Sequence, residues 1–173
     1  MKPNPERERW SGRVDFAAGR LSYTAPNRTG WSIDPAEIRL IAEETIEAWG
    51  GDWWIHFALE SSWVRFPVYA AGFQEVWDRL ADTFPGMELG LASSTSFKSR
   101  VLWPQSLRGQ PLFDYQPERD PPWWRRLLSL GRIESSPTPA VSGYLDATNA
   151  STNSPPADRE SSGGDTGGEQ PDK

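Results

Sequence analysis

Apolar and polar residues alternate along the first part of the chain in short runs that are typical of β-strands. Residues 13–16 and 20–24 each carry an apolar side chain at every second position, and Ala17-Ala18-Gly19 separates the two runs. Two alternating runs joined by a short loop predict a β-hairpin. Trp31 and Ile33 alternate with polar neighbours after a loop that contains Pro and Gly, so we expect a third strand there.

The next segment, residues 34–46, begins with a helix-start signal. Asp34 can cap free backbone N–H groups, Pro35 suits the first helical position, and Glu37 occupies the capping-box position. The following residues fit two patterns: a helical stripe of Ile38, Ile41, Thr45 and Trp49, or a strand face of Ile38, Leu40, Ala42 and Ile46. We expect a single helical turn that leads into a strand.

A second hairpin is predicted after the turn Gly50-Gly51-Asp52. Every second residue from Trp53 to Leu59 is large and apolar, which is the pattern of a strand with one buried face. Residues 63–66 follow after a turn at residues 60–62 and supply the partner strand.

The clearest helical pattern lies between Gly72 and Phe84. Its apolar residues recur with the spacing of one helix face: Phe73, Val76, Trp77, Leu80, Ala81 and Phe84. Pro85-Gly86 ends the pattern. A helix with one apolar stripe must pack on an apolar surface, and the Trp-rich strands before it supply that surface.

Periodicity is lost after this helix. Apolar residues within 87–120 follow neither the strand nor the helix period, and Pro104, Pro111 and Pro117 interrupt regular structure. We therefore expect an extended arm packed on the body, with one strand at about 99–103.

Both ends of the chain differ in composition from its middle. Residues 135–173 consist mostly of Ser, Thr, Pro, Gly, Asn and Asp, with Val141, Tyr144 and Leu145 as the only large apolar or aromatic residues. Such a segment buries too little apolar area to offset the entropy of ordering it, so we expect a disordered acidic tail. The polar residues 1–11 predict a flexible N-terminus.

Several strands in meander order, followed by one amphipathic helix, resemble the pleckstrin-homology-like superfold of small bacterial proteins. The resemblance covers residues 12–86 and rests on the hairpin 53–66 and on the helix with Phe73, Trp77 and Leu80. It implies an α+β fold, with an antiparallel meander sheet or partly open barrel of five to seven strands closed by one helix. It also implies a binding platform without catalysis. Phosphoinositide binding is not carried over, because the first hairpin has no cluster of basic residues.

The amino-acid composition excludes several classes of function. The chain holds ten Trp, one His and no Cys, so few nucleophilic, metal or redox schemes are available, and we expect no enzyme activity, no metal and no cofactor. Most of the net charge of −6 falls within 135–173, so the nearly neutral body offers no basic face to nucleic acid. Because no secretory signal and no membrane-spanning run is evident, we expect a cytoplasmic protein.

Trp54 and His56 alternate out of phase with the apolar positions of their predicted strand. We interpret His56 as a structural or surface histidine, since the sequence contains no Cys and no G-x-S-x-G motif that it could serve. Burial of His56 beside a carboxylate in a pocket would instead favour an enzyme. If the sheet closes into a barrel, Trp54 and His56 face outward and form a candidate contact patch.

The densest acidic stretch spans residues 34–47. As a helix, its carboxylates would form a solvated face, and as a strand, Glu43 and Glu44 would point to opposite sides. Neither geometry brings carboxylates together, so we expect no acid–base or metal site there.

Residues 121–134 predict a short amphipathic helix. We expect a helix that closes the domain by packing on the body, but the same face could anchor the protein in a membrane interface or dock in a partner's groove. The candidate contact residues are Trp123, Trp124, Arg125, Arg126, Leu127 and Leu128.

Taken together, these patterns predict a non-enzymatic interaction module that binds a protein partner. The alternative is a peripheral membrane protein anchored by residues 121–133. An enzyme of unknown class is the third hypothesis.

Overall fold

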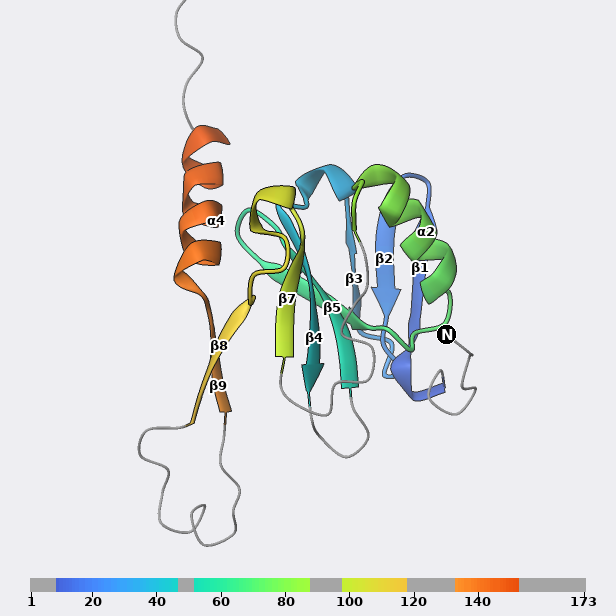
Figure 1. Cartoon of the computed structure of the whole chain (residues 1–173). Helices are drawn as coiled ribbons and strands as arrows, with labels where there is room; N and C mark the ends of the chain where they lie inside the picture. Colours follow the sequence, from blue (N-terminus) through green and yellow to red (C-terminus); the bar gives the residue numbers. More distant parts are fainter. Residues whose placement is uncertain (1–8, 47–51, 88–97, 118–132, 153–173) are drawn as a thin grey trace, which may run out of the picture.

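The computed structural model describes residues 9–46, 52–87, 98–117 and 133–152 of the chain (Figure 1). Antiparallel strands form three sheets, with the orders β1-β2-β3, β6-β5-β4-β7 and β8-β9. The strands are β1 (Arg13–Ala17), β2 (Arg20–Thr24), β3 (Gly30–Ile33), β4 (Leu40–Ile46), β5 (Asp52–Ala58), β6 (Trp63–Pro67), β7 (Lys98–Trp103), β8 (Phe113–Pro117) and β9 (Ile133–Pro137). Helix α2 spans Phe73–Thr83, and helix α4 spans Pro139–Thr152.

The first sheet confirms the predicted hairpin and third strand. Strands β1 and β2 pair from Arg13 with Thr24 to Ala17 with Arg20, and β3 pairs along the other side of β2. Ala18 and Gly19 connect the hairpin, both with positive φ angles. A two-residue turn of this kind matches the twist of the strands that it joins.

The segment after β3 is a single helical turn followed by a strand, as expected. The Asp34 carboxylate accepts a hydrogen bond from the backbone N–H of Ala36 at 2.9 Å, and a 3-10 turn spans Pro35–Glu37. Ile38 is already extended, and β4 begins at Leu40. Pairing of β4 with neighbours on both sides decides between the two patterns that its sequence fits.

The four-stranded sheet contains the second predicted hairpin, formed by β5 and β6. Its fourth strand, β7, pairs with β4, so the prediction of residues 87–120 as an arm draped over the body is wrong for this part. The strand expected at about 99–103 does exist, but it completes the central sheet. Its partner lies more than 50 residues earlier in the sequence, as the pairing of Thr45 with Lys98 shows, and local periodicity carries no information about such a partner.

Helix α2 confirms the helical stripe. It buries Val76 and Leu80, and its N-terminal cap is Gly72 at a φ of 87°. A Cβ atom at Gly72 would lie 2.3 Å from the carbonyl oxygen of Val14, so both the conformation and the close approach to β1 require glycine.

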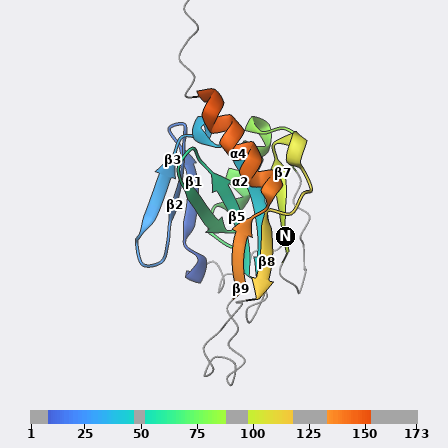
Figure 2. The same ribbon diagram turned by 90° about the vertical axis from the view of Figure 1, so that its left-hand side faces the viewer.

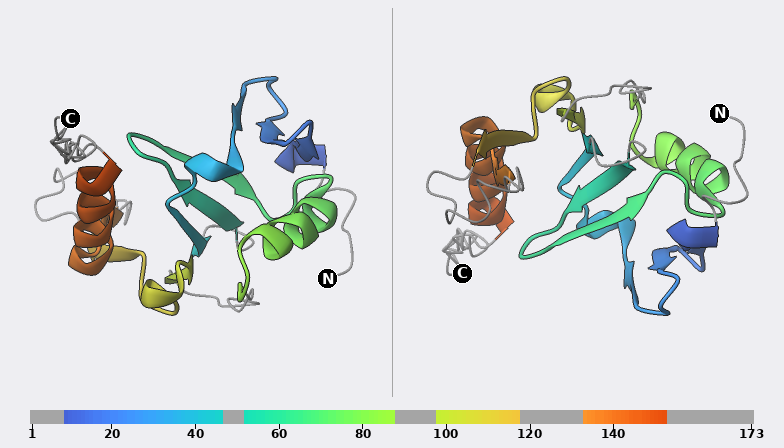
Figure 3. Two further views of the ribbon diagram at one scale, coloured as in Figure 1. Left: turned by 90° about the horizontal axis from the view of Figure 1, so that it is seen from above. Right: turned by 90° about the horizontal axis from the view of Figure 1, so that it is seen from below.

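Each face of the four-stranded sheet covers a separate core. The inner face packs against the first sheet and α2, and the outer face packs against α4 and the β8–β9 hairpin, so that α2 and α4 lie on opposite sides (Figure 3). The inner core includes Ile41, Ile55, Phe57, Phe66 and Leu80. The outer core consists of Leu40, Ala42, Ala58, Val101, Leu107, Leu112 and Val141.

The structure corrects two further expectations. Residues 133–152, most of which were predicted as disordered tail, form β9 and α4, and Val141 is fully buried against the outer face. Composition alone underestimated the order of this segment, because its few apolar side chains pack on a surface that strands distant in sequence supply. The described strands also form three separate sheets rather than one meander sheet or one partly open barrel. Residues 1–8, 118–132 and 153–173 lie outside the described part.

We expect Leu80→Ala to lower the free energy of unfolding by about 2–5 kcal/mol, because the deleted atoms leave a cavity between α2 and the inner face. Urea denaturation of the purified variant measures this. Asp82→Ala on the exposed side of the same helix is the control, and its effect should stay within about 0.5 kcal/mol. Equal losses in both variants would contradict the packing described for α2.

Candidate functional site

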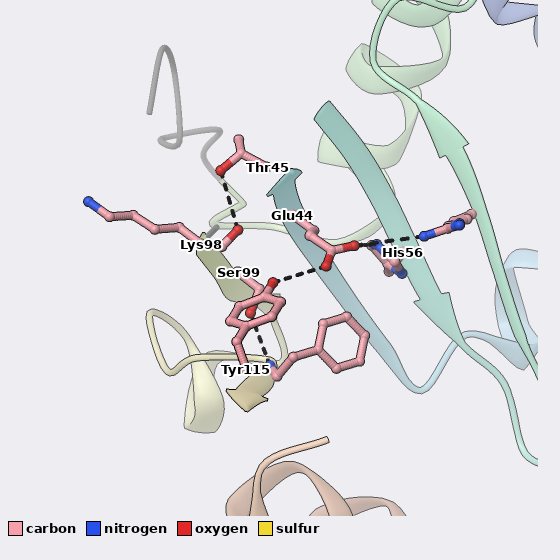
Figure 4. Close-up of polar contacts among 8 residues, drawn as sticks. Glu44, Thr45, His56, Lys98, Ser99 and Tyr115 are labelled. Carbon is pink, nitrogen blue, oxygen red and sulfur yellow. Dashed lines mark hydrogen bonds and ion pairs between the residues drawn. The ribbon is translucent and has the colours of Figure 1, made fainter. Parts of the chain in front are cut away.

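A cluster of polar side chains lies on the outer face of the four-stranded sheet, where four strands and the β8–β9 hairpin meet (Figure 4). Strand alternation places Glu44 and His56 on this face, directly across from neighbours that point the same way. We call this group the outer polar cluster, and its members are Glu44 of β4, His56 of β5, Arg65 of β6, Ser99 of β7 and Tyr115 of β8.

Glu44 is the centre of the outer polar cluster. Its Oε1 accepts a hydrogen bond from the Tyr115 hydroxyl at 3.0 Å, and its Oε2 lies 2.8 Å from Nε2 of His56. Because an ionised carboxylate can only accept, the His56 Nε2–H donates. The guanidinium of Arg65 lies 3.8 Å from the same Oε2. Both carboxylate oxygens of this buried residue are therefore engaged by side chains of other strands.

These contacts set the protonation of the carboxylate. Burial by itself would raise the pKa of Glu44, but the hydrogen bond and charge of His56, the hydroxyl of Tyr115 and the charge of Arg65 together hold that pKa below its usual value of 4.5. Burial and the neighbouring Glu44 carboxylate raise the pKa of Tyr115 well above its ordinary value. Glu44 is therefore ionised, and Tyr115 keeps its proton and donates it in a hydrogen bond to the Glu44 carboxylate.

His56 is buried, with 5% of its surface exposed. Its ring meets the Phe113 ring edge to face at a centroid distance of 5.5 Å, and the Phe113 backbone N–H donates to Oγ of Ser99 at 2.9 Å. The histidine therefore sits beside a carboxylate, the arrangement that would favour an enzyme, but Phe113 covers it. The cluster fastens β8 to the sheet through Tyr115, Phe113 and Ser99.

Glu43 points to the opposite face, as expected for a strand. It is fully buried, its Oε1 accepts from Nε of Arg100 at 2.5 Å, and its Oε2 accepts from the indole N–H of Trp53 at 3.1 Å. The two adjacent carboxylates thus stabilise separate layers. Within the described ranges, no group of three or more His, Cys, Asp or Glu residues is placed to hold a metal ion.

Beside the outer polar cluster lies a partly exposed group of aromatic and cationic side chains. The Arg65 guanidinium stacks over the Trp54 ring at 4.6 Å from its centroid, and Trp63 contacts Phe113 at a centroid distance of 6.2 Å. Trp63 is 39% exposed, and the side chain of Arg65 is 50% exposed. We call Trp54, Trp63, Arg65 and Phe113 the outer aromatic patch.

The structure describes two of the predicted contact residues, Trp54 and His56, and not the others. Trp54 and His56 share the outer face as expected, although the sheet forms no barrel and only Trp54 has appreciable exposure. The candidates Trp123, Trp124, Arg125, Arg126, Leu127 and Leu128 lie outside the described residues. Of the predicted helix 121–134, only Ile133 and Glu134 are described, and both belong to strand β9 rather than to a helix, because they pair with β8.

Sequence reasoning missed Trp63, Arg65, Phe113 and Tyr115. Trp63 and Arg65 could have been found, because they alternate on β6 in register with Ala58 and His56 of the predicted hairpin. Phe113 and Tyr115 gave no such signal, since they reach the patch through long-range contacts of β8.

Comparisons with known proteins add no family to this description: no family model, no curated protein and no solved structure matches the chain. The resemblance to the pleckstrin-homology-like superfold therefore stays a prediction. None of the described helices is both long and apolar enough to span a membrane.

We expect Glu44→Gln to lower the free energy of unfolding at about pH 7 by about 1–3 kcal/mol, because the buried His56 and Tyr115 lose their charged acceptor. A carboxyl with a lowered pKa stabilises the fold above its unfolded pKa, and this contribution is lost as the pH falls below about 4.5. The difference between wild type and variant should therefore shrink in acid.

Urea denaturation from about pH 7 down to about pH 3 measures this difference. Glu60→Gln, which changes an exposed carboxyl in the β5–β6 turn, is the control and should follow the wild type throughout. A gap that stays constant with pH would show that Glu44 does not act through its charge.

Proposed function

We propose that this protein is a non-enzymatic binding module that contacts a protein partner through the outer aromatic patch. The observation that carries the proposal is the exposure of Trp63 on a strand of the central sheet. The described part of the chain has two exposed large hydrophobic residues, Trp10 and Trp63, and Trp63 is the one held within a sheet. Exposed Trp and Arg side chains are typical of the residues that dominate protein interfaces.

The side chains of the patch are held in place before any partner binds. Trp63 rests on Phe113, which in turn rests on the buried His56 ring. Arg65 is held between the Trp54 ring and the Glu44 carboxylate. Ordering such residues on binding costs little conformational entropy, so more of the contact energy remains for affinity.

The chemistry of the patch indicates the kind of partner surface it fits. Trp63 offers a broad apolar face, and the half-exposed guanidinium of Arg65 offers donors suited to a carboxylate. A partner segment with a large apolar residue next to Asp or Glu would match both. Anionic and apolar groups on a protein surface supply that combination.

The outer polar cluster supports a structural role rather than catalysis. A general base must come within hydrogen-bond reach of a substrate proton. His56 is instead bonded to Glu44 and covered by Phe113, and Glu44 is engaged on both oxygens. Glu44 and His56 instead attach β8 to the sheet, through the hydroxyl of Tyr115 and the ring of Phe113.

A second candidate function, membrane anchoring by residues 121–133, is favoured by one observation. Strands β8 and β9 pair Pro117 with Ile133, so the two ends of the intervening segment are held together at one end of a hairpin. A segment rich in Trp, Leu and Arg suits a membrane interface. Because both ends of this segment are attached at the hairpin, its binding to a surface would not require displacement of β8 or β9.

For the protein-binding proposal, we expect affinity capture from a lysate of the native cells to yield a protein that binds the wild type and is lost with Trp63→Ser. Arg65→Gln should weaken the same complex at least tenfold in calorimetry with the purified partner, since each 1.4 kcal/mol of lost contact energy is tenfold. Arg13→Gln removes the same charge from an exposed position of β1 and should bind as the wild type does.

The three variants should melt within a few degrees of one another, which separates binding from folding. A captured protein that binds Trp63→Ser and Arg65→Gln with wild-type affinity would exclude the outer aromatic patch as the contact surface.

For membrane anchoring, we expect the full chain to sediment with anionic vesicles and to stay in solution when Trp123, Trp124, Leu127 and Leu128 are all changed to Ser. The vesicles contain phosphatidylserine or neutral lipid alone, and both proteins should have the same melting temperature. The internal substitution keeps β9 and α4, which a chain ended at Asp120 would lose. Absence of the wild type from every vesicle pellet would eliminate this candidate.

A further inference from the structure

Helix α4 covers an apolar face that is built to receive a helix. Figure 2 shows α4 running across the outer side of the four-stranded sheet, and the surface under it consists of aliphatic and small side chains: Leu40, Ala42, Ala58, Val101 and Leu112. The two alanines occupy neighbouring strands, where their small size lets a helix approach the sheet closely.

The helix that occupies this face fits it poorly. The side chains of α4 with reduced exposure recur at helical spacing: Val141, Ser142, Tyr144, Leu145, Thr148 and Asn149. Val141 is the one that is fully buried, and the last two are polar. About half of the contact stripe of α4 therefore adds little apolar burial to a strongly apolar surface.

The intrinsic stability of α4 is also low. Its 14 residues include Gly143 in the interior, with several Ser, Thr and Asn residues of weak helix propensity. A helix of this length is marginal without tertiary contacts.

Contacts at its two ends hold α4 in place. Thr138, just before the helix, donates from its hydroxyl to the carbonyl of Pro111 and from its backbone N–H to that of Leu112, each at 3.0 Å. At the other end, the Asn149 side chain donates to the carbonyl of Glu60 at 3.0 Å. The attachment at Thr138 precedes the helix, so it would keep the chain before α4 docked while α4 itself moves away.

We propose that the outer face under α4 is a helix-docking site, that α4 is its internal occupant, and that an amphipathic helix of a protein partner replaces it. This inference rests on the proposed function and extends it. Ala58, under α4, pairs with Trp63 of the outer aromatic patch, so the uncovered face and the patch form one continuous surface.

The surface defines the partner helix. Aliphatic residues at the positions equivalent to Val141, Leu145 and Thr148 would bury more apolar area than α4 does. An acidic residue at the end near β6 would meet the exposed guanidinium of Arg65. The partner is therefore an amphipathic helix with an aliphatic stripe and an acidic end.

The test uses full-length protein and a fluorescent synthetic peptide of residues 138–152 that carries Gly143→Ala and Thr148→Leu. Val141→Asp in the protein should release α4 and strengthen peptide binding at least tenfold relative to wild type, as measured by fluorescence anisotropy. Ala140→Asp adds the same charge on the exposed side of α4 and should bind as the wild type does.

Gly143→Ala in the protein tests the opposite direction. An added Cβ at Gly143 meets no atom within 4 Å, so the change should raise the stability of α4 without a clash. Peptide binding should then weaken by about fivefold, the effect of one Gly-to-Ala exchange in a helix. Peptide binding that is the same for Val141→Asp, Gly143→Ala and wild type would overturn the inference.

Hydrogen exchange of the wild type gives an independent result that does not depend on any variant folding. Amides of α4 should exchange much faster than those of β4 and β5, because the helix opens without the sheet. Exchange of α4 and the central strands at one common rate would mean that α4 does not leave on its own, and the inference would fail. A partner that depends on Trp63 could still exist in that case, so the proposed function would be judged separately.

Discussion

Strand β4 has both faces buried and carries a carboxylate into each of them, and the rest of the architecture depends on how those two charges are satisfied. On the inner face, the Glu43 carboxylate accepts hydrogen bonds from Arg100 of β7 and Trp53 of β5. On the outer face, the Glu44 carboxylate accepts hydrogen bonds from His56 of β5 and Tyr115 of β8. A buried carboxylate without partners is strongly destabilising, so the strands that donate to these two residues are tied to β4.

This constraint orders the layers from the centre outward. The inner carboxylate fixes β7 beside β4, which completes the sheet on which the first sheet and α2 pack. The outer carboxylate fixes β8, and β8 positions β9 and the start of α4. Polar contacts therefore select the arrangement, whereas the two apolar cores supply most of its stability through burial.

The same division separates the structural groups from those available for binding. His56 and Glu44, which have the residue types of an acid–base pair, are hydrogen-bonded to each other, and Phe113 covers the His56 ring. Trp63 and Arg65 are exposed on that face, and they resemble interface residues in chemistry and in rigidity. Helix α4 lies beside these residues and covers a sheet surface that is more apolar than the helix face packed on it. The outer face of the sheet therefore has two parts, the exposed outer aromatic patch and the apolar surface under α4.

Local pattern by itself determined the hairpins β1–β2 and β5–β6, strand β3, the turn at Pro35 and helix α2, because each depends on neighbours within a few residues. The opposite directions of Glu43 and Glu44 followed only once pairing with β5 and β7 made β4 a strand. Local pattern also placed Trp54 and His56 on one face. Only the tertiary structure decided that β7 joins β4, that Tyr115 meets Glu44, and that residues 133–152 fold as β9 and α4. Those outcomes depend on surfaces and partners distant in sequence, and a segment poor in apolar residues becomes ordered when another part of the chain supplies the surface on which it packs.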